Sequence, residues 1–262
     1  MPARLGARTP TRGHALHAVT LENLVPVGYT IGEGAYRRAA PHAIRRGTAM
    51  PTTISPPRED RDQRVVLGHV SWETYESLLA DHADVRSPRF TFSEGMLEIM
   101  SPSSEHEKLN QILATIADLV AEEQEIEFEN LGSTTFRRQD IDRGTEPDSC
   151  FYIQNVESIR GKKEIDLRVD PPPDLVIEVE ITSPAVPKLP VYARLGVPEI
   201  WLHDGRAPRI LRLSGDQYEN SDRSGVLPSL TQSVLSAFCE QRGTLTMLAW
   251  RRMVRTWARQ QA

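Results

Sequence analysis

Residues 174–182 read Asp-Leu-Val-Ile-Glu-Val-Glu-Ile-Thr, and this stretch decides the fold class of the chain. Side chains alternate between the two sides of a β-strand, so the odd-numbered positions form a uniformly apolar side, as a side facing a core must be. The even-numbered side holds the acids Asp174, Glu178 and Glu180. Carboxylates on such a strand are costly unless a cation compensates them, and a hard ion such as Mg²⁺ or Mn²⁺ would do so.

A further acid and a lysine are candidates for the same site. Glu146-Pro147-Asp148 precedes another apolar stretch, so Asp148 could meet the acids of 174–182 from a neighbouring strand. Lys188 lies eight residues after Glu180, in the first turn of a predicted helix. Beside a metal, a lysine can position the attacking water and stabilise charge that develops on a phosphate. Periodicity alone is equally compatible with a solvent-facing strand that bears ordinary surface acids, and Lys188 would then be a surface residue.

Apolar periodicity along the rest of the chain predicts helices and strands in mixed order. Helices are predicted over 72–80, 105–124, 187–195, 231–238 and 245–262, and the second of these, with Ser104 as its N-cap, has the clearest pattern. Strands are predicted over 90–93, 96–100, 126–129, 133–138, 148–153, 174–182, 199–203, 209–213 and 217–219. The Glu94-Gly95 pair between the first two strands predicts a hairpin.

The charge is unevenly distributed along the chain. Residues 1–49 contain seven arginines, no lysine and two glutamates, a net charge of +5, so the other 213 residues carry −10 of the total of −5. An acidic body is not typical of a nucleic-acid binder, because phosphate contacts need lysine and arginine. Weak periodicity predicts a disordered leader over 1–63, followed by one domain over 64–240 and a basic C-terminal helix over 241–262.

The hydropathy of the chain and its two cysteines indicate the cellular compartment in which we expect the protein. No apolar run approaches the roughly 18 residues that a membrane span needs, so we expect a soluble protein. Cys150 and Cys239 lie far apart without a CxxC spacing, which argues against a disulfide scaffold or a structural zinc site. Both are expected to be small buried apolar residues of a protein in the reducing cytoplasm.

Several segments together resemble one known family. They are 97–103 (LEIMSPS) with 105–107 (EHE), 173–179 (PDLVIEV), 188–193 (KLPVYA) and 195–201 (LGVPEIW). An acid after proline, a strand with Glu-x-Glu and a nearby lysine resemble the PD-(D/E)XK nuclease pattern. The segments as a set are similar to the Uma-two family of restriction-endonuclease-like proteins, over roughly residues 70–240.

The resemblance implies an α/β fold with a restriction-endonuclease-like core, a central mixed β-sheet flanked by helices, often assembled as a homodimer. Asp148 and Glu178 match the two metal-binding acids of the family, and Lys188 matches its lysine. The sequence departs from the wider superfamily at Glu180, which stands where that lysine usually lies and could bind metal or orient Lys188. The family also has an early acid, for which Glu98 and Glu107 are both candidates. His106 lies at the start of the predicted helix, where the family often has histidine, and it could face the site or have a capping or packing role.

These observations support three functions of unequal weight. The first is a metal-dependent endonuclease that hydrolyses phosphodiester bonds in DNA, with Mg²⁺ or Mn²⁺ held by Asp148 and Glu178 and a water assisted by Lys188. The second is a catalytically silent binding or regulatory module that keeps the nuclease fold, which the acidic body favours. The third, a sugar hydrolase with paired carboxylates, fits poorly with a lysine and with two acids on one strand.

Overall fold

The strand predicted over 174–182 is β8 (Leu175–Val179), and it lies inside a six-stranded mixed sheet. The computed structural model describes residues 61–262 except 84 and 86, and every structural statement below concerns that part of the chain. The strand order is β11-β10-β9-β8-β7-β4, in which β8 and β9 run parallel and the other neighbours antiparallel. The other strands of this sheet are β4 (Glu129–Asn130), β7 (Ser149–Tyr152), β9 (Glu199–His203), β10 (Pro208–Ser214) and β11 (Gln217–Asn220).

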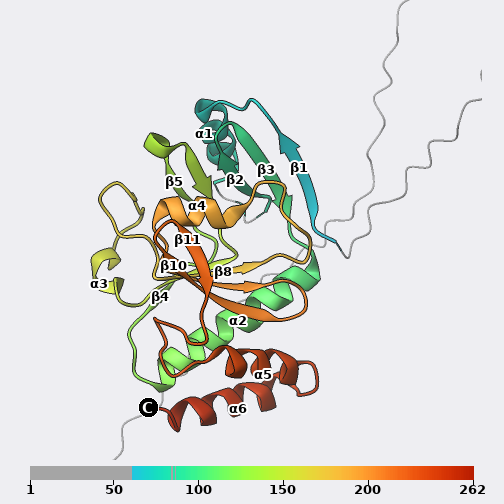
Figure 1. Cartoon of the computed structure of the whole chain (residues 1–262), viewed down its shortest axis with the longest axis vertical. Helices are drawn as coiled ribbons and strands as arrows, with labels where there is room; N and C mark the ends of the chain where they lie inside the picture. The colour runs from blue at the N-terminus through green and yellow to red at the C-terminus, as the bar shows by residue number, and fades with distance from the viewer. Residues whose placement is uncertain (1–60, 84, 86) are drawn as a thin grey trace, which may run out of the picture. The chain divides into compact units, whose positions relative to one another are not determined.

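A second sheet, which the sequence patterns did not indicate as separate, has five antiparallel strands in the order β1-β3-β2-β6-β5 (Figure 1). Its strands are β1 (Gln63–Leu67), β2 (Arg89–Ser93), β3 (Met96–Ser101), β5 (Phe136–Arg138) and β6 (Arg143–Thr145). Helix α1 (Trp72–Asp81) packs on this sheet, where Tyr75 joins the buried side chains of Phe90, Phe92 and Leu97. The predicted hairpin at Glu94-Gly95 is confirmed, because β2 and β3 pair antiparallel with Ser93 opposite Met96, and both turn residues adopt a positive φ.

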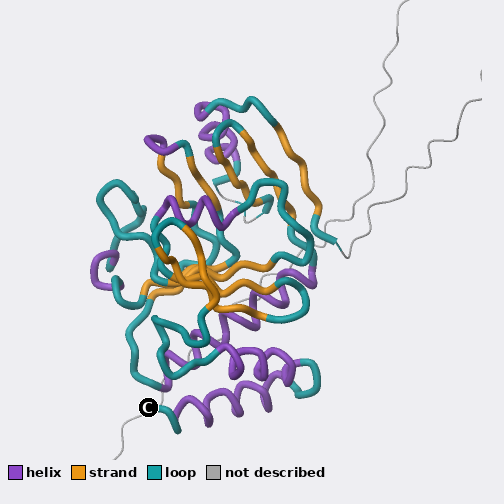
Figure 2. Tube along the Cα trace, in the orientation of Figure 1, coloured by secondary structure: helices purple, strands orange, loops and turns teal. Residues whose placement is uncertain are grey.

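Helices cover both faces of the mixed sheet, as Figure 2 shows by element type. On one face, Leu175 and Ile177 of β8 pack with α2 (Ser104–Glu123), α5 (Gln232–Arg242) and α6 (Met247–Arg259). On the other face, Val176 packs with α4 (Lys188–Leu195) and α3 (Val156–Ile159). All five residues of β8 are buried, so the alternative of a solvent-facing strand is wrong.

Local sequence signals explain where the main helices begin and end. The side chains of Ser71, Ser103, Thr231 and Thr246 accept hydrogen bonds from free backbone N–H groups at the starts of α1, α2, α5 and α6. The cap of α2 is therefore Ser103, one residue before the predicted Ser104. Helix α4 ends at Gly196, whose φ of 82° is a left-handed conformation that glycine adopts without strain, and the chain then turns into β9.

Most predicted elements are present, with shorter strands near residue 130. Of the strand predicted over 126–129, only Glu129 lies in a strand, the two-residue β4. The elements β6, α3 and the 3-10 turn η1 (Gln139–Ile141) were not predicted. The predicted C-terminal helix is α6, which packs against α2 and buries Trp250, Val254 and Ala258 in the same core. The predicted disordered leader lies, apart from residues 61–63, outside the described residues. Within the described part of the chain, none of the helices has the length and apolarity to traverse a bilayer.

Candidate active site

Asp148 and Glu178 lie across from each other on neighbouring antiparallel strands. The register pairs Ser149 with Ile177, so its continuation by one residue places Asp148 opposite Glu178. The backbone N–H of Val179 donates a 2.7 Å hydrogen bond to Asp148 Oδ2, which fixes this carboxylate at the end of β8. Both acids are almost completely buried. The predicted meeting of the two acids from neighbouring strands is what the fold produces.

Glu178 is held by two side chains of α4. Lys188 Nζ donates a 2.7 Å hydrogen bond to Glu178 Oε2, and the Tyr192 hydroxyl donates to Glu178 Oε1. Lys188 and Tyr192 are four residues apart and therefore lie on the same side of the helix. Lys188 is only 3% exposed, so it is a buried partner of Glu178 and not a surface residue.

Asp148 is held by side chains from two further elements. Arg89 of β2 donates through Nη1 to Asp148 Oδ1, and His106 of α2 donates through Nε2 to Asp148 Oδ2 at 2.8 Å. The guanidinium also donates through Nη2 to Glu107 Oε1 at 2.5 Å. Asp148 is thus a shared acceptor for residues of both sheets and of the helix that connects β3 to β4.

His106 lies inside the site, which answers one question that the sequence left open. Its Nδ1 is 3.1 Å from Asp62 Oδ2, and Asp62 also accepts a 2.9 Å hydrogen bond from the backbone N–H of Ser103. With a carboxylate at each ring nitrogen, the imidazole is a donor on both sides, which describes the protonated form. Burial lowers the pKa of His106, but the hydrogen bonds to Asp148 and Asp62 outweigh it and raise that pKa to about 9.

Burial and pairing act in opposite directions on the two central acids. Burial raises the pKa of Asp148, but Arg89, His106 and Lys188 outweigh this and hold the pKa below its usual range, so Asp148 is ionised. Burial is the largest effect on Glu178, and together with the nearby Asp148 it raises the pKa of Glu178 despite the contact with Lys188. Carboxylates in one site with pKa values pushed apart are frequent in active sites.

The two candidates for the early acid have different surroundings. Glu107, at the start of α2, reaches the site through Arg89. Glu98 of β3 is buried and accepts hydrogen bonds from Arg64 and from the backbone N–H groups of Ala185 and Val186, just before α4. Of the two, Glu107 is the acid that shares a cation with Asp148.

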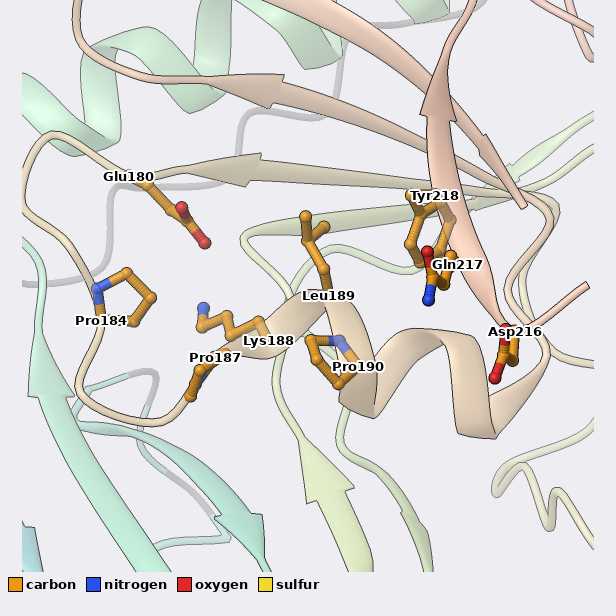
Figure 3. A pocket seen from close by; sticks show the side chains of 9 residues that line it. All are labelled: Glu180, Pro184, Pro187, Lys188, Leu189, Pro190, Asp216, Gln217 and Tyr218. Atoms are coloured by element: carbon orange, nitrogen blue, oxygen red, sulfur yellow. The ribbon is translucent and has the colours of Figure 1, made fainter. Parts of the chain in front are cut away.

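Glu180 lies at the edge of the site and not within the Glu178 pair. It is half-buried beyond the end of β8, and burial raises its pKa. With Lys188 it lines a pocket of about 580 Å³ that Pro184, Pro187 and Tyr218 also border (Figure 3). Asp174, at the other end of the strand, accepts hydrogen bonds from Ile153 and Asn155 instead and stabilises a turn.

Carboxylate oxygens are the ligands that Mg²⁺ and Mn²⁺ prefer, so the donor types of the site suit the ion that the family resemblance implies. The arrangement of these carboxylates in the structure does not suit a metal ion. Every carboxylate oxygen of Asp148 and Glu178 already accepts a hydrogen bond from an internal donor. Within residues 61–262, apart from the two undescribed positions, no three His, Cys, Asp or Glu side chains stand together in a way that could hold a metal ion.

Comparisons with known proteins agree with the motifs that lie around this site. The sequence model of the Uma2 family, described as "Putative restriction endonuclease", matches residues 72–242. The chain belongs to the Uma2 family. Among solved structures, this Uma2 chain is similar to a crystal structure from Anabaena variabilis described as "a putative nuclease belonging to DUF820". The two share 20% sequence identity with a TM-score of 0.41, over 61% of this chain and 97% of that one. No curated protein matches the chain.

Membership of the Uma2 family agrees with the predicted fold class, a restriction-endonuclease-like α/β core with a mixed sheet flanked by helices. The sequence patterns missed three members of the site, namely Arg89, Asp62 and Tyr192. Tyr192 had a signal, because it lies one helical turn after Lys188 and both were expected on the same helix. Arg89 and Asp62 had none, since they approach Asp148 and His106 from positions 59 and 44 residues away in the chain.

Proposed function

We propose that the chain is an endonuclease that hydrolyses phosphodiester bonds in DNA, with Asp148, Glu178, Glu180 and Lys188 as its catalytic residues and Mg²⁺ or Mn²⁺ as its cofactor. The observation that carries the proposal is the meeting of Asp148, Glu178 and Lys188, from three separate elements, in one buried cluster. Buried charges are expensive, and ionisable groups with strongly perturbed pKa values cluster at functional sites. The family's description points to the same class of reaction.

The side chains present suit a reaction at a phosphate group. Lys188 is a compact ammonium group, kept charged because the carboxylates of Glu178 and Asp148 outweigh the effect of burial and raise its pKa. Such a group can donate a hydrogen bond to an attacking water or to a phosphate oxygen on which charge develops. Glu178 fixes the position of its nitrogen, and the hydroxyl of Tyr192 in turn fixes the carboxylate of Glu178. The pocket beside Lys188 and Glu180 gives this end of the site an opening to solvent (Figure 3).

Two observations favour the silent module as a second candidate. The acids of the site are already neutralised by Arg89, Lys188 and His106. In addition, the large groove between α1, β5 and the 159–168 loop is lined by five basic and five acidic residues. Four of those bases pair with acids: Arg137 with Glu76, Arg138 with Asp140, Lys162 with Asp170 and Arg168 with Asp166. Such a groove offers little positive potential to a phosphate backbone.

Cleavage of supercoiled plasmid and of single-stranded DNA separates the two candidates. With Mg²⁺ or Mn²⁺ we expect cleavage, favoured by Mn²⁺, that Lys188→Ala and Glu178→Ala abolish. Lys108→Ala, which removes an exposed lysine of α2 that lines neither the pocket nor the groove, is the matched control and should cleave like wild type. Equal nicking by all four proteins would identify a contaminating nuclease, and no cleavage of any substrate by the wild type would favour the silent module.

We further propose that the protein acts in the cytoplasm and as a homodimer. Both cysteines are free, Cys150 in the core and Cys239 partly buried, which suits a reducing compartment. Support for the dimer comes from β1, which lies at the edge of its sheet and leaves Val65 56% exposed, with Val66 and Leu67 also exposed. An apolar edge strand is a template for pairing with another chain.

A further inference from the structure

Arg89 connects two acids that face different surroundings. Its Nη1 donates to Asp148, which is buried, and its Nη2 donates to Glu107, whose side chain is 38% exposed. Arg89 itself is buried, and its Nε has no hydrogen-bond partner in the described structure. Arg89 Nη1 also lies 3.3 Å from His106 Nε2. A buried N–H without a partner costs free energy, so the guanidinium is not fully satisfied in this position.

The charges around Asp148 leave no room for an additional cation without a rearrangement. Arg89 and Lys188 supply two positive charges to the two carboxylates of Asp148 and Glu178, and His106 donates to Asp148 as well. Lys188 lies in the first turn of α4 and donates to Glu178. The Nδ1 of His106, the ring nitrogen that does not contact Asp148, is held by Asp62. Arg89 is the cation with a second, more exposed partner to which it can remain bound.

We propose that Arg89 is an internal counter-ion that competes with the divalent metal for Asp148, and that Glu107 holds Arg89 when it releases that carboxylate. The proposal rests on the proposed function in so far as it concerns the metal of that site. It gives Glu107 the role of a positioning residue that acts through Arg89. It also accounts for an acid-rich site whose described residues contain no ready metal-binding group.

The competition has a definite thermodynamic consequence. When a ligand binds only a conformation that is fractionally populated, its apparent affinity falls by that fraction. Arg89 on Asp148 is the conformation that excludes the metal, so removal of the guanidinium should raise metal affinity. Loss of Glu107 should lower metal affinity, because Arg89 then has no acid to hold it away from Asp148.

The test is Mn²⁺ binding to the full-length protein, measured by isothermal titration calorimetry without nucleic acid. We expect Arg89→Met to bind Mn²⁺ more tightly than the wild type, by a factor of about 5 to 150, the usual range of coupling between two interacting sites. Arg137→Met, which removes an arginine that pairs with Glu76 on the protein surface, is the matched control and should bind like the wild type. Wild-type affinity in Arg89→Met would overturn the proposal.

Glu107→Gln tests the second half of the proposal and does not depend on the folding of Arg89→Met. We expect it to weaken Mn²⁺ binding, and unchanged or tighter binding would overturn the role of Glu107. If Glu107 were instead a metal ligand, Glu107→Gln would weaken binding in the Arg89→Met background too. If it acts through Arg89, the double variant should bind as tightly as Arg89→Met alone. Thermal melts of each variant establish that it is folded.

The proposed nuclease activity and the proposed role of Arg89 would be contradicted by different results. If the chain is a silent module, DNA is not cleaved, yet the order of Mn²⁺ affinities among the wild type, Arg89→Met, Glu107→Gln and the double variant still holds. If the chain is a nuclease but Arg89 does not compete with the metal, DNA is cleaved while Arg89→Met binds Mn²⁺ no more tightly than wild type. Calorimetry without substrate therefore decides the role of Arg89 independently of catalysis.

Discussion

At the scale of single residues, the site is a set of buried ion pairs. Lys188 has Glu178 as its hydrogen-bonded acid, and both are almost fully removed from solvent. Removing one partner of a buried pair leaves the other charge without compensation, whereas replacing both by apolar residues of similar size is often neutral. The residues proposed for catalysis are therefore also residues on which folding depends.

Lys188→Ala should reduce the free energy of unfolding by about 3–5 kcal/mol, because Glu178 would remain buried without its cation. Urea unfolding followed by circular dichroism measures this change. Lys188→Met combined with Glu178→Leu should be less destabilised than Lys188→Ala. A change within about half a kcal/mol for Lys188→Ala, as expected of a surface residue, would contradict the buried pair. The measured stability also shows at which temperatures the variants stay folded, and the cleavage assay should be run at such a temperature.

Some residues of the site were predictable from the sequence and others were not, for a physical reason. Asp148, Glu178 and Lys188 lie next to apolar elements with regular spacing, so their strands and helix could be inferred from neighbouring residues. Arg89 lies in a strand whose pattern indicated only a hairpin, and its contact with Asp148 depends on how the second sheet packs. Local periodicity does not report which elements of a fold meet in space.

At the scale of elements, the first strand is part of the site. Asp62 directly precedes β1, and its carboxylate accepts hydrogen bonds from His106, from Arg64 and from the backbone N–H of Ser103 at the start of α2. Burial raises the pKa of Asp62, but the contacts with His106 and Ser103 outweigh it and lower that pKa to about 2. The contribution of Asp62 to stability is thus fully present at neutral pH and is lost as the pH falls through about 2. The predicted boundary at 63/64 would remove this residue.

Two truncated chains distinguish the contribution of the leader to stability from that of the contacts of Asp62. A chain that begins at Met50 should melt like the full-length protein, whereas one that begins at Arg64 should melt several degrees lower, since a domain of this size loses roughly 2–4 °C for each kcal/mol. The Asp62→Ala variant of the chain from Met50 should reproduce most of that loss. Differential scanning calorimetry of these proteins is the measurement. Equal melting temperatures for the chains from Met50 and Arg64 would show that Asp62 contributes nothing to stability.

At the scale of the whole molecule, the proposed dimer depends on the free edge of the five-stranded sheet. Val65→Lys should prevent edge-to-edge pairing, because a charged side chain in the middle of an edge strand opposes the addition of another strand. Light scattering after size-exclusion chromatography should show a dimer for wild type and a monomer for Val65→Lys. Val169→Lys changes an equally apolar but isolated exposed residue and should leave the dimer intact. A wild-type protein that is monomeric at all concentrations would contradict the proposed dimer.

The position of the charged cluster between the two sheets has a consequence for how the molecule unfolds. Arg89 belongs to the five-stranded sheet, whereas Asp148 and Glu178 belong to the six-stranded one, and the ion pair between Arg89 and Asp148 crosses from one to the other. The first sheet cannot separate while these charges are paired, and separation would expose Asp148 without its main cation. Opening of the five-stranded sheet alone therefore exposes a buried charge in addition to the apolar core of that sheet. We expect residues 61–262 to unfold as a single cooperative unit with no stable half-folded form.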